Sequence, residues 1–284
     1  MSTAFRLAPL LFFFALLGPA SHAAVNLAGP TTEWTSLGTN FDFLEDQQTG
    51  QADSDIVGDA TDPGFYTTYD PADGFLAFRV RLDDRGGNKN NPSFDDNLWI
   101  GIDADLSGSI DAFIGVNTQG SNELIQIYAP GSGSNTSPNT TTIANNPFYS
   151  VGISSSNYDY RPVDFTTDGG STNDMTPGTS GDPDYYVSFQ IEFAQVVAFL
   201  SGAGIDIDDA SPLRYVVATS TQANSLNQDL GGIDGNDSTF DPNTPWEDLG
   251  GFTPLVTASG QIVPEPAPAL LGAVALVFLL RRRR

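Results

Sequence analysis

The residues best suited to chemistry form one short loop, which runs from Asp103 to Asp111 (DADLSGSID). The loop has side-chain oxygens at positions 1, 3, 5 and 9, a glycine at position 6 and a backbone carbonyl at position 7. Ca²⁺ takes about six to eight oxygen ligands, so a chain that binds it must turn sharply around the ion. We therefore predict a calcium site with the following ligands: Asp103, Asp105, Ser107, Ser109 and Asp111.

This loop departs from the EF-hand pattern, because its twelfth position is Ile114 where an EF-hand has glutamate. Its flanks, LWIGI and AFIGV, have the composition of strands. A carboxylate from elsewhere would then complete the site, and Asp95 and Asp96 are the nearest candidates. The alternative is a hairpin loop whose Asp, Ser and Gly residues serve only turn geometry and hydration.

The elements that would hold this loop are strands. Runs rich in Val, Ile, Phe and Tyr alternate with clusters of turn-forming residues, which is typical of an all-β domain. In the range 75–82 the apolar residues alternate with Arg79 and Arg81, which predicts one face in the core and one in water. Further strands are expected at 98–102, 112–117, 124–129, 148–153, 185–193 and 213–220, a short helix or strand extension at 194–200, and surface loops at 130–146 and 161–184.

The N-terminus has the layout of a secretory signal peptide. Arg6 precedes the apolar run 7–17, and small residues follow as far as Ala23 and Ala24, the two most suitable cleavage positions. We therefore expect a signal peptide at 1–23, a β-sandwich ectodomain at 24–262 and a separate C-terminal segment at 263–284.

The C-terminal segment has three parts: the motif Pro264, Glu265 and Pro266, the apolar stretch 267–280, and the basic end Arg281, Arg282, Arg283 and Arg284. The stretch makes a helix about 21 Å long, shorter than the ~30 Å core of a bilayer, and the arginines favour the cytoplasmic side. This order resembles the PEP-CTERM sorting signal of exosortase substrates. The resemblance implies an exosortase as partner, a membrane anchor before processing, and a final place in the cell envelope or exopolysaccharide matrix; a plain tail anchor is the alternative.

Charge and composition exclude several functions. Residues 24–262 hold six of the 11 basic and 34 of the 35 acidic residues, a formal charge near −28. This charge excludes a nucleic-acid partner and favours divalent cations. The chain has no cysteine, and its one histidine, His22, lies in the expected leader. Disulfides, thiolate chemistry and histidine-dependent sites are therefore excluded from the mature chain.

Catalysis without histidine would require a pair of carboxylates, one of them held protonated by an apolar setting. Glu123 and Glu192 are eligible, but no spacing selects a pair, so we do not expect an enzyme; a secreted carbohydrate-active hydrolase is the alternative. Binding is better supported. Trp246, in the loop-like sequence PNTPWEDLGG, is expected to be exposed and is the candidate glycan contact.

The range 73–117, from DGFLAFRVRL to AFIGVN, resembles the β-sandwich modules related to family 9 carbohydrate-binding modules and DOMON domains. The resemblance implies an antiparallel, jelly-roll-like sandwich with sugar or calcium ligands. We therefore expect an exported, calcium-stabilised surface protein with a structural, adhesive or glycan-binding role. A surface-layer or biofilm protein that self-associates without a small ligand is a further alternative.

Overall fold

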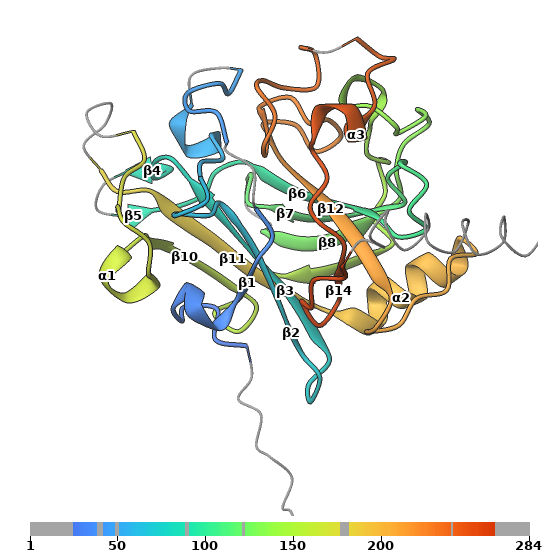
Figure 1. The fold of residues 1–284 in the computed structure, drawn as a ribbon, viewed down its shortest axis with the longest axis horizontal. Coiled ribbons are helices and arrows are strands. Elements are labelled where there is room, and N and C mark those ends of the chain that lie inside the picture. Colours follow the sequence, from blue (N-terminus) through green and yellow to red (C-terminus); the bar gives the residue numbers. More distant parts are fainter. Residues whose placement is uncertain are drawn as a thin grey trace, which may run out of the picture.

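The computed structural model describes residues 25–38, 42–48, 51–88, 91–120, 123–176, 182–239 and 241–264, and two antiparallel sheets dominate it (Figure 1). The first sheet has the order β1 (Thr35–Ser36), β2 (Phe65–Asp70), β3 (Phe75–Leu82), β11 (Tyr185–Glu192) and β10 (Tyr158–Pro162). The second has the order β13 (Asp229–Leu230), β12 (Pro212–Ser220), β6 (Asn97–Asp103), β7 (Ala112–Asn117), β8 (Leu124–Tyr128) and β9 (Tyr149–Gly152), with β14 (Val256–Thr257) also paired to β12.

The remaining elements are short. A two-stranded ribbon joins β4 (Gly87–Asn88) to β5 (Asn91–Pro92). The α-helices are α1 (Phe165–Asp168), α2 (Phe193–Gly202) and α3 (Trp246–Leu249), and the 3₁₀ turns are η1 (Thr31–Glu33), η2 (Ala52–Ser54) and η3 (Pro138–Thr140).

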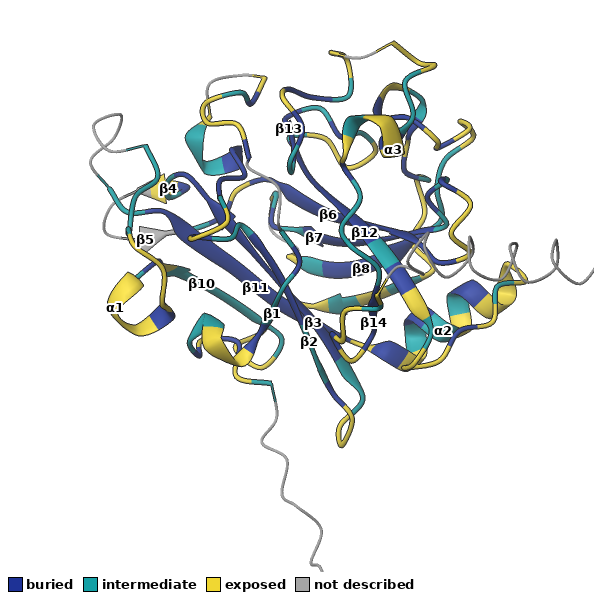
Figure 2. Ribbon diagram, viewed as in Figure 1, coloured by how far each residue is buried: buried dark blue, intermediate teal, exposed yellow. Residues whose placement is uncertain are grey.

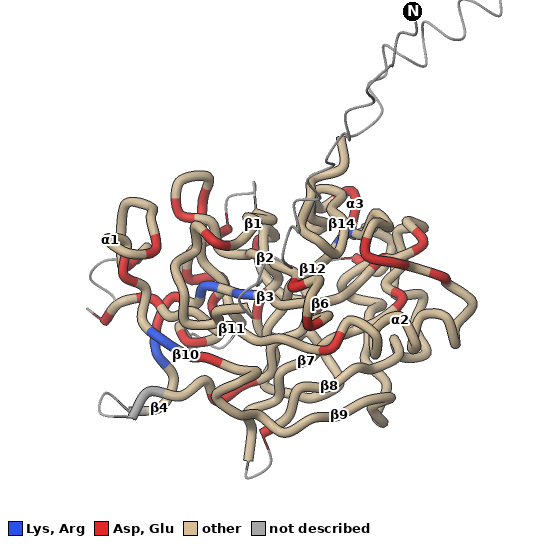
Figure 3. Tube along the Cα trace, turned by 90° about the horizontal axis from the view of Figure 1, so that it is seen from below, with Lys and Arg blue, Asp and Glu red and all other residues tan. Residues whose placement is uncertain are grey.

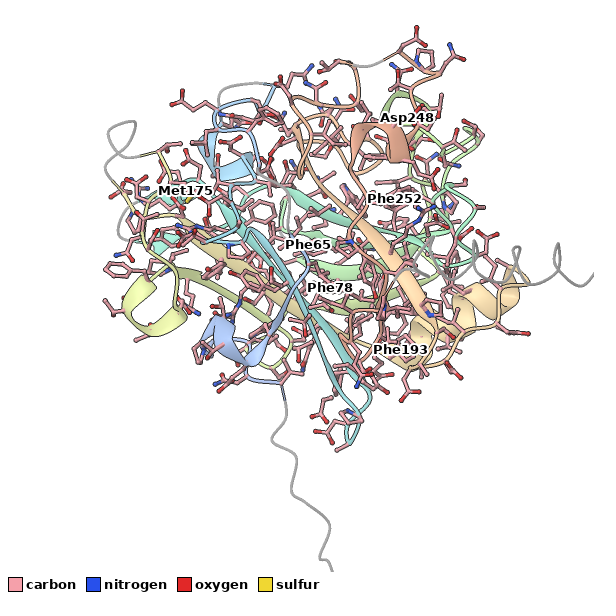
Figure 4. The ribbon with its side chains drawn as sticks, in the orientation of Figure 1. Phe65, Phe78, Met175, Phe193, Asp248 and Phe252 are labelled. Atoms are coloured by element: carbon pink, nitrogen blue, oxygen red, sulfur yellow. The ribbon has the colours of Figure 1, made fainter. Side chains whose placement is uncertain are left out.

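The main core lies between the two sheets, so the expected antiparallel β-sandwich is confirmed. Alternate residues of the strands of both sheets turn inward and form one cluster of buried side chains (Figure 2). Phe65 and Phe78 stack at its centre with ring centroids 6.1 Å apart, and Phe78 also meets Tyr215 of the facing sheet edge to face at 5.2 Å (Figure 4). The jelly-roll strand path stays a prediction.

Most expected strands are present. β3 and β7 occupy the predicted ranges, and the stretch after β11 is a helix, α2, which buries Val196 and Leu200 on one face. The four-residue spacing of these two side chains places both against the core. The longest strands that were not predicted are β2 and β10, and the end of β10 overlaps the stretch 161–184 that was expected to be a loop. The two-residue strands β1, β4, β5, β13 and β14 were not predicted either.

The prediction that Arg79 and Arg81 face water is wrong, because both side chains are at most 1 % exposed. The N-terminal segment covers this outer face of β3, and the Arg79 guanidinium lies 4.3 Å from the ring centre of Trp34. Arg81 is paired with Asp184 at 2.6 Å. A long arginine stem packs well against apolar surface when its charged end finds partners, which is why an alternating pattern did not reveal the cover.

The outer face of the second sheet is covered as well. Trp99 of β6 lies there in a second buried cluster, and Gly115 of the neighbouring strand leaves room for it, since a Cβ at Gly115 would lie 2.0 Å from the Trp99 ring. The stretch 130–146, expected to be a surface loop, forms part of this cover and buries Thr141 and Ile143.

The expected signal peptide at 1–23 and most of the expected sorting segment lie outside the described residues. Of the sorting motif, only Pro264 is described, and it is exposed. Within the described ranges, no helix has the length and apolar character required to cross a membrane.

Candidate metal centres

The structure brings the predicted loop of residues 103–111 together as the connection between β6 and β7. Carboxylate oxygens of Asp103, Asp105 and Asp111 lie within 4.8 Å of one another, an arrangement that can hold a metal ion. Asp103 is fully buried, whereas Asp105 is exposed. We call these three residues the hairpin triad.

Asp103 already has a full set of partners. Its two carboxylate oxygens accept hydrogen bonds from the backbone N–H groups of Ser107 and Gly108, at 3.0 and 2.9 Å. The guanidinium of Arg214, directly opposite on β12, pairs with the same carboxylate at 2.7 Å and reaches Glu247 at 2.7 Å. The buried charge of the hairpin triad is therefore neutralised by the protein itself.

The other predicted ligands serve the turn in this structure. Asp111 accepts the N–H of Ala104 at 2.8 Å, and the Ser109 hydroxyl donates to the Ser134 carbonyl at 3.0 Å. Ser107 is exposed. These contacts agree with the turn-geometry alternative, while calcium binding by this loop stays a prediction.

The proposal that Asp95 or Asp96 completes the hairpin site is wrong. Both residues precede β6, whereas Asp103 is the last residue of that strand, so they lie at its opposite end. Asp96 instead accepts hydrogen bonds from the Ser54 hydroxyl and the Gln119 side chain.

A second acidic group was not predicted. Asp46, Asp55 and Asp229 also place carboxylate oxygens within 4.8 Å of one another, and can likewise hold a metal ion. Asp42 lies beside them, close enough for its charge to act on Asp46 and Asp229. We call these four residues the acidic quartet; Asp42, Asp55 and Asp229 are each at least 95 % buried.

Backbone amides orient the acidic quartet. Asp55 accepts the N–H of Glu45 at 2.9 Å, and Asp229 accepts the N–H of Ile56 at 2.6 Å. Asp46 accepts the N–H of Gly235 at 2.7 Å. Glu45 has a φ of 63°, a left-handed conformation that closes the turn between Asp42 and Asp46. The segment thus folds back so that its carboxylates converge.

Burial and mutual repulsion raise the pKa values of the acidic quartet. Burial raises the pKa of the Asp55 carboxyl to about 8, and the nearby charge of Asp46 adds to this, although the Glu45 amide opposes it. Burial also raises the pKa of Asp229 and of Asp42 well above the ordinary range, with further increases from the other members. None of the ion pairs among the described residues includes a quartet member.

A third acidic group lies at the end of β3 and consists of Asp83, Asp174 and Asp184. Like the hairpin triad, it has a basic partner: Arg81 binds Asp184. Thr176 donates its hydroxyl to Asp83. Figure 3 shows that basic segments gather near β3 and β10, while acidic ones are spread over many loops.

The prediction that Trp246 is an exposed glycan contact is wrong. Trp246 is fully buried, and its indole N–H donates to the Thr141 hydroxyl at 3.1 Å. Trp99 and Trp34 are also buried. A tryptophan in polar, turn-rich sequence was mistaken for an exposed one because its partners come from a loop 105 residues earlier.

The acidic quartet escaped notice in the sequence because its members are single aspartates scattered from residue 42 to residue 229. The only indication in the sequence was the excess of acidic over basic residues. This excess favours cation binding but does not show which residues would bind the cation. No protein-family model, curated protein or solved structure matches this chain.

Proposed function

We propose that this chain is an exported, calcium-stabilised β-sandwich with a structural, adhesive or glycan-binding role at the cell surface or in its exopolysaccharide. Export and sorting by an exosortase are supported by the signal-like N-terminus and by the PEP-CTERM-like order of residues 263–284. Attachment to the membrane would then be transient, through the apolar stretch that precedes the terminal arginines.

The observation that carries the calcium part of the proposal is the gathering of carboxylates into three tight groups within one sandwich. Oxygen ligands suit Ca²⁺, and the mature chain has neither histidine nor cysteine for softer metals. A strongly acidic extracellular protein gains stability when a divalent cation neutralises clustered carboxylates.

The glycan part is supported by a groove of about 620 Å³ where the edge strands β9 and β10 approach each other. Its walls combine apolar side chains with polar ones, the latter including those of residues 154–157, and Tyr149 provides an aromatic surface. Gln190 lines the groove, and its buried side-chain amide oxygen lacks a hydrogen-bond partner. Polar side chains beside an aromatic ring are the chemistry by which proteins bind neutral sugars.

A polysaccharide binding assay with the producer's own exopolysaccharide tests this role. We expect the chain to be retained without shortening the polymer, and Tyr149→Ala to abolish retention. Phe148→Ala is the matched control, because Phe148 is an exposed neighbouring ring that does not line the groove. Depolymerisation would favour the hydrolase alternative, and self-association without retention would favour a surface-layer protein.

A further inference from the structure

We infer that the acidic quartet binds one Ca²⁺ ion, which links residues 42–48 and 51–56 to the two sheets of the sandwich. This inference rests on the proposed function, since it assigns the calcium to a particular site. The site lies where the stretch that carries Asp42, Asp46 and Asp55 meets β13, which follows β12 in the chain (Figure 1).

Unpartnered oxygens are the first observation that points to a ligand. Asp42, Asp46 and Asp55 each have one buried carboxylate oxygen, Oδ1, that accepts no hydrogen bond from a donor group, although the carboxyls of Asp46 and Asp55 lie close enough to interact with each other. The other oxygen of Asp46 and of Asp55 is held by a backbone amide. A fully buried carboxylate oxygen without a partner is costly, because nothing replaces the water that it has lost.

The second observation is that no basic side chain among the described residues pairs with the acidic quartet. The five described arginines direct their guanidinium groups elsewhere: Arg81, Arg85, Arg161 and Arg214 pair with other carboxylates, and Arg79 donates to Ser188 and Leu27. In the described part of the chain, the converging carboxyls are therefore held by backbone amides and by the contact between Asp46 and Asp55, with no basic side chain paired to them. A bound divalent cation would supply the missing charge.

The burial of the site suits calcium better than magnesium. Ca²⁺ binds oxygens at roughly 2.4 Å in flexible geometry, and a site for it can be formed largely by protein ligands. The carboxylate oxygens of Asp46, Asp55 and Asp229 lie within 4.8 Å of one another. Mg²⁺ needs about 2.1 Å to each ligand and keeps several waters, for which a largely buried site leaves little room.

Water can complete the coordination. A small cavity of about 40 Å³ is lined by Asp42 together with Gly231 and Gly232. A cavity of this size has room for one water molecule beside the Asp42 carboxyl. Carboxylates, with a water at the open side, would supply the about six to eight oxygens that Ca²⁺ requires.

The site would connect the two sheets through the segment that carries Asp55. Ile56 forms a β-bridge with Leu82 at the end of β3, and its N–H donates to Asp229 in β13 of the other sheet. The Thr219 hydroxyl of β12 donates to the Ser54 carbonyl. An ion held by Asp46, Asp55 and Asp229 would therefore link the stretch that carries Asp46 and Asp55 to both sheets.

Calorimetric titration of the full chain with CaCl₂, after chelation and desalting, tests the assignment. We expect Asp46→Asn to weaken the tightest calcium site roughly tenfold or more, since it removes one ligand charge. Asp105→Asn in the hairpin triad removes the same charge from an exposed position and should leave that affinity unchanged. Asp46 is only partly buried, so this variant is the one best placed to fold.

Two results would overturn the assignment in different ways. If calcium binds and Asp105→Asn weakens it while Asp46→Asn does not, the quartet is the wrong site and the calcium proposal stands. If the unaltered chain takes up no calcium at millimolar concentration, both fall.

Hydrogen exchange on the unaltered chain provides a test that needs no variant. Calcium should slow exchange at the amides of Glu45, Ile56 and Gly235, which donate to the quartet. Slowing confined to the amides of Ser107 and Gly108 would instead locate the ion at the hairpin triad and overturn the inference.

Discussion

The hairpin triad and the acidic quartet both bring carboxylates within one ion's reach, and they differ in what neutralises them. In the hairpin triad the buried Asp103 is paired with Arg214, and the other two carboxylates are wholly or partly in water. In the acidic quartet three carboxylates are buried and no described arginine reaches them. The loop 103–111, which has the better calcium-binding motif, thus has less need of an ion. The local motif does not reveal that Arg214, from another strand, neutralises Asp103.

The largest effect on stability should come from removing the basic partner of the hairpin triad, which leaves its buried carboxylate unpaired like those of the acidic quartet. Arg214→Gln leaves Asp103 buried without its cation, so we expect a loss of about 3–5 kcal/mol in the free energy of unfolding, measured by urea titration with chelator present. Added calcium should then restore part of that stability. Arg85→Gln is the control, since it breaks a partly exposed pair with Asp182 and should cost no more than about 1 kcal/mol. Equal losses in the two variants would contradict the comparison.

Calcium itself should have the next largest effect. At a free concentration about a hundred times Kd, binding stabilises the folded chain by about 2.7 kcal/mol, or roughly 5–10 °C in Tm. Thermal unfolding with and without calcium should show this shift in the unaltered chain and in Asp111→Asn, but not in Asp229→Asn. A shift that disappears with Asp111→Asn would reverse the roles of the two sites.

The pH dependence of the metal-free chain should sharpen the contrast further. The pKa of Asp55 is about 8 in the folded chain, so between about pH 4 and pH 8 the folded state holds a proton that the unfolded state has released. Stability in chelator should therefore fall as pH rises through this window, and calcium should oppose the fall most strongly near pH 8. Urea midpoints at pH 5 and pH 8 measure it. Asp55→Asn should flatten the profile, and a steeper fall in that variant would show that other groups are responsible.

The smallest effect on stability is expected from the exposed ion pair between Arg214 and Glu247, beside the hairpin triad. Glu247 accepts from Arg214 at 2.7 Å, but its side chain is 57 % exposed. Glu247→Gln should change the free energy of unfolding by no more than about 0.5 kcal/mol, because solvent screens such pairs. The same urea titration measures it, and a loss comparable to that of Arg214→Gln would mean that the pair is not screened.

Much of the fold was predictable, because alternation along a half-buried strand is a local property. β3 and β11 show this, with Phe78 and Phe189 turned inward at the two-residue period. The α2 helix could not be distinguished from a strand over seven residues, since short apolar runs suit both. The segments that cover the outer faces of the two sheets could not be predicted either. In an alternating strand pattern, Arg79 has the position of a residue that faces water.

Sequence alone determined the composition, the excess of carboxylates, the strand pattern and the turn between β6 and β7, all of which depend on residues close together in the chain. The export and sorting signals at the two ends are predictions of the same local kind. Only the tertiary structure decided that Trp246 is buried, that Arg214 neutralises Asp103, and that Asp42, Asp46, Asp55 and Asp229 converge. The physical reason is that burial and charge pairing depend on which distant segments lie side by side, and no local spacing records that.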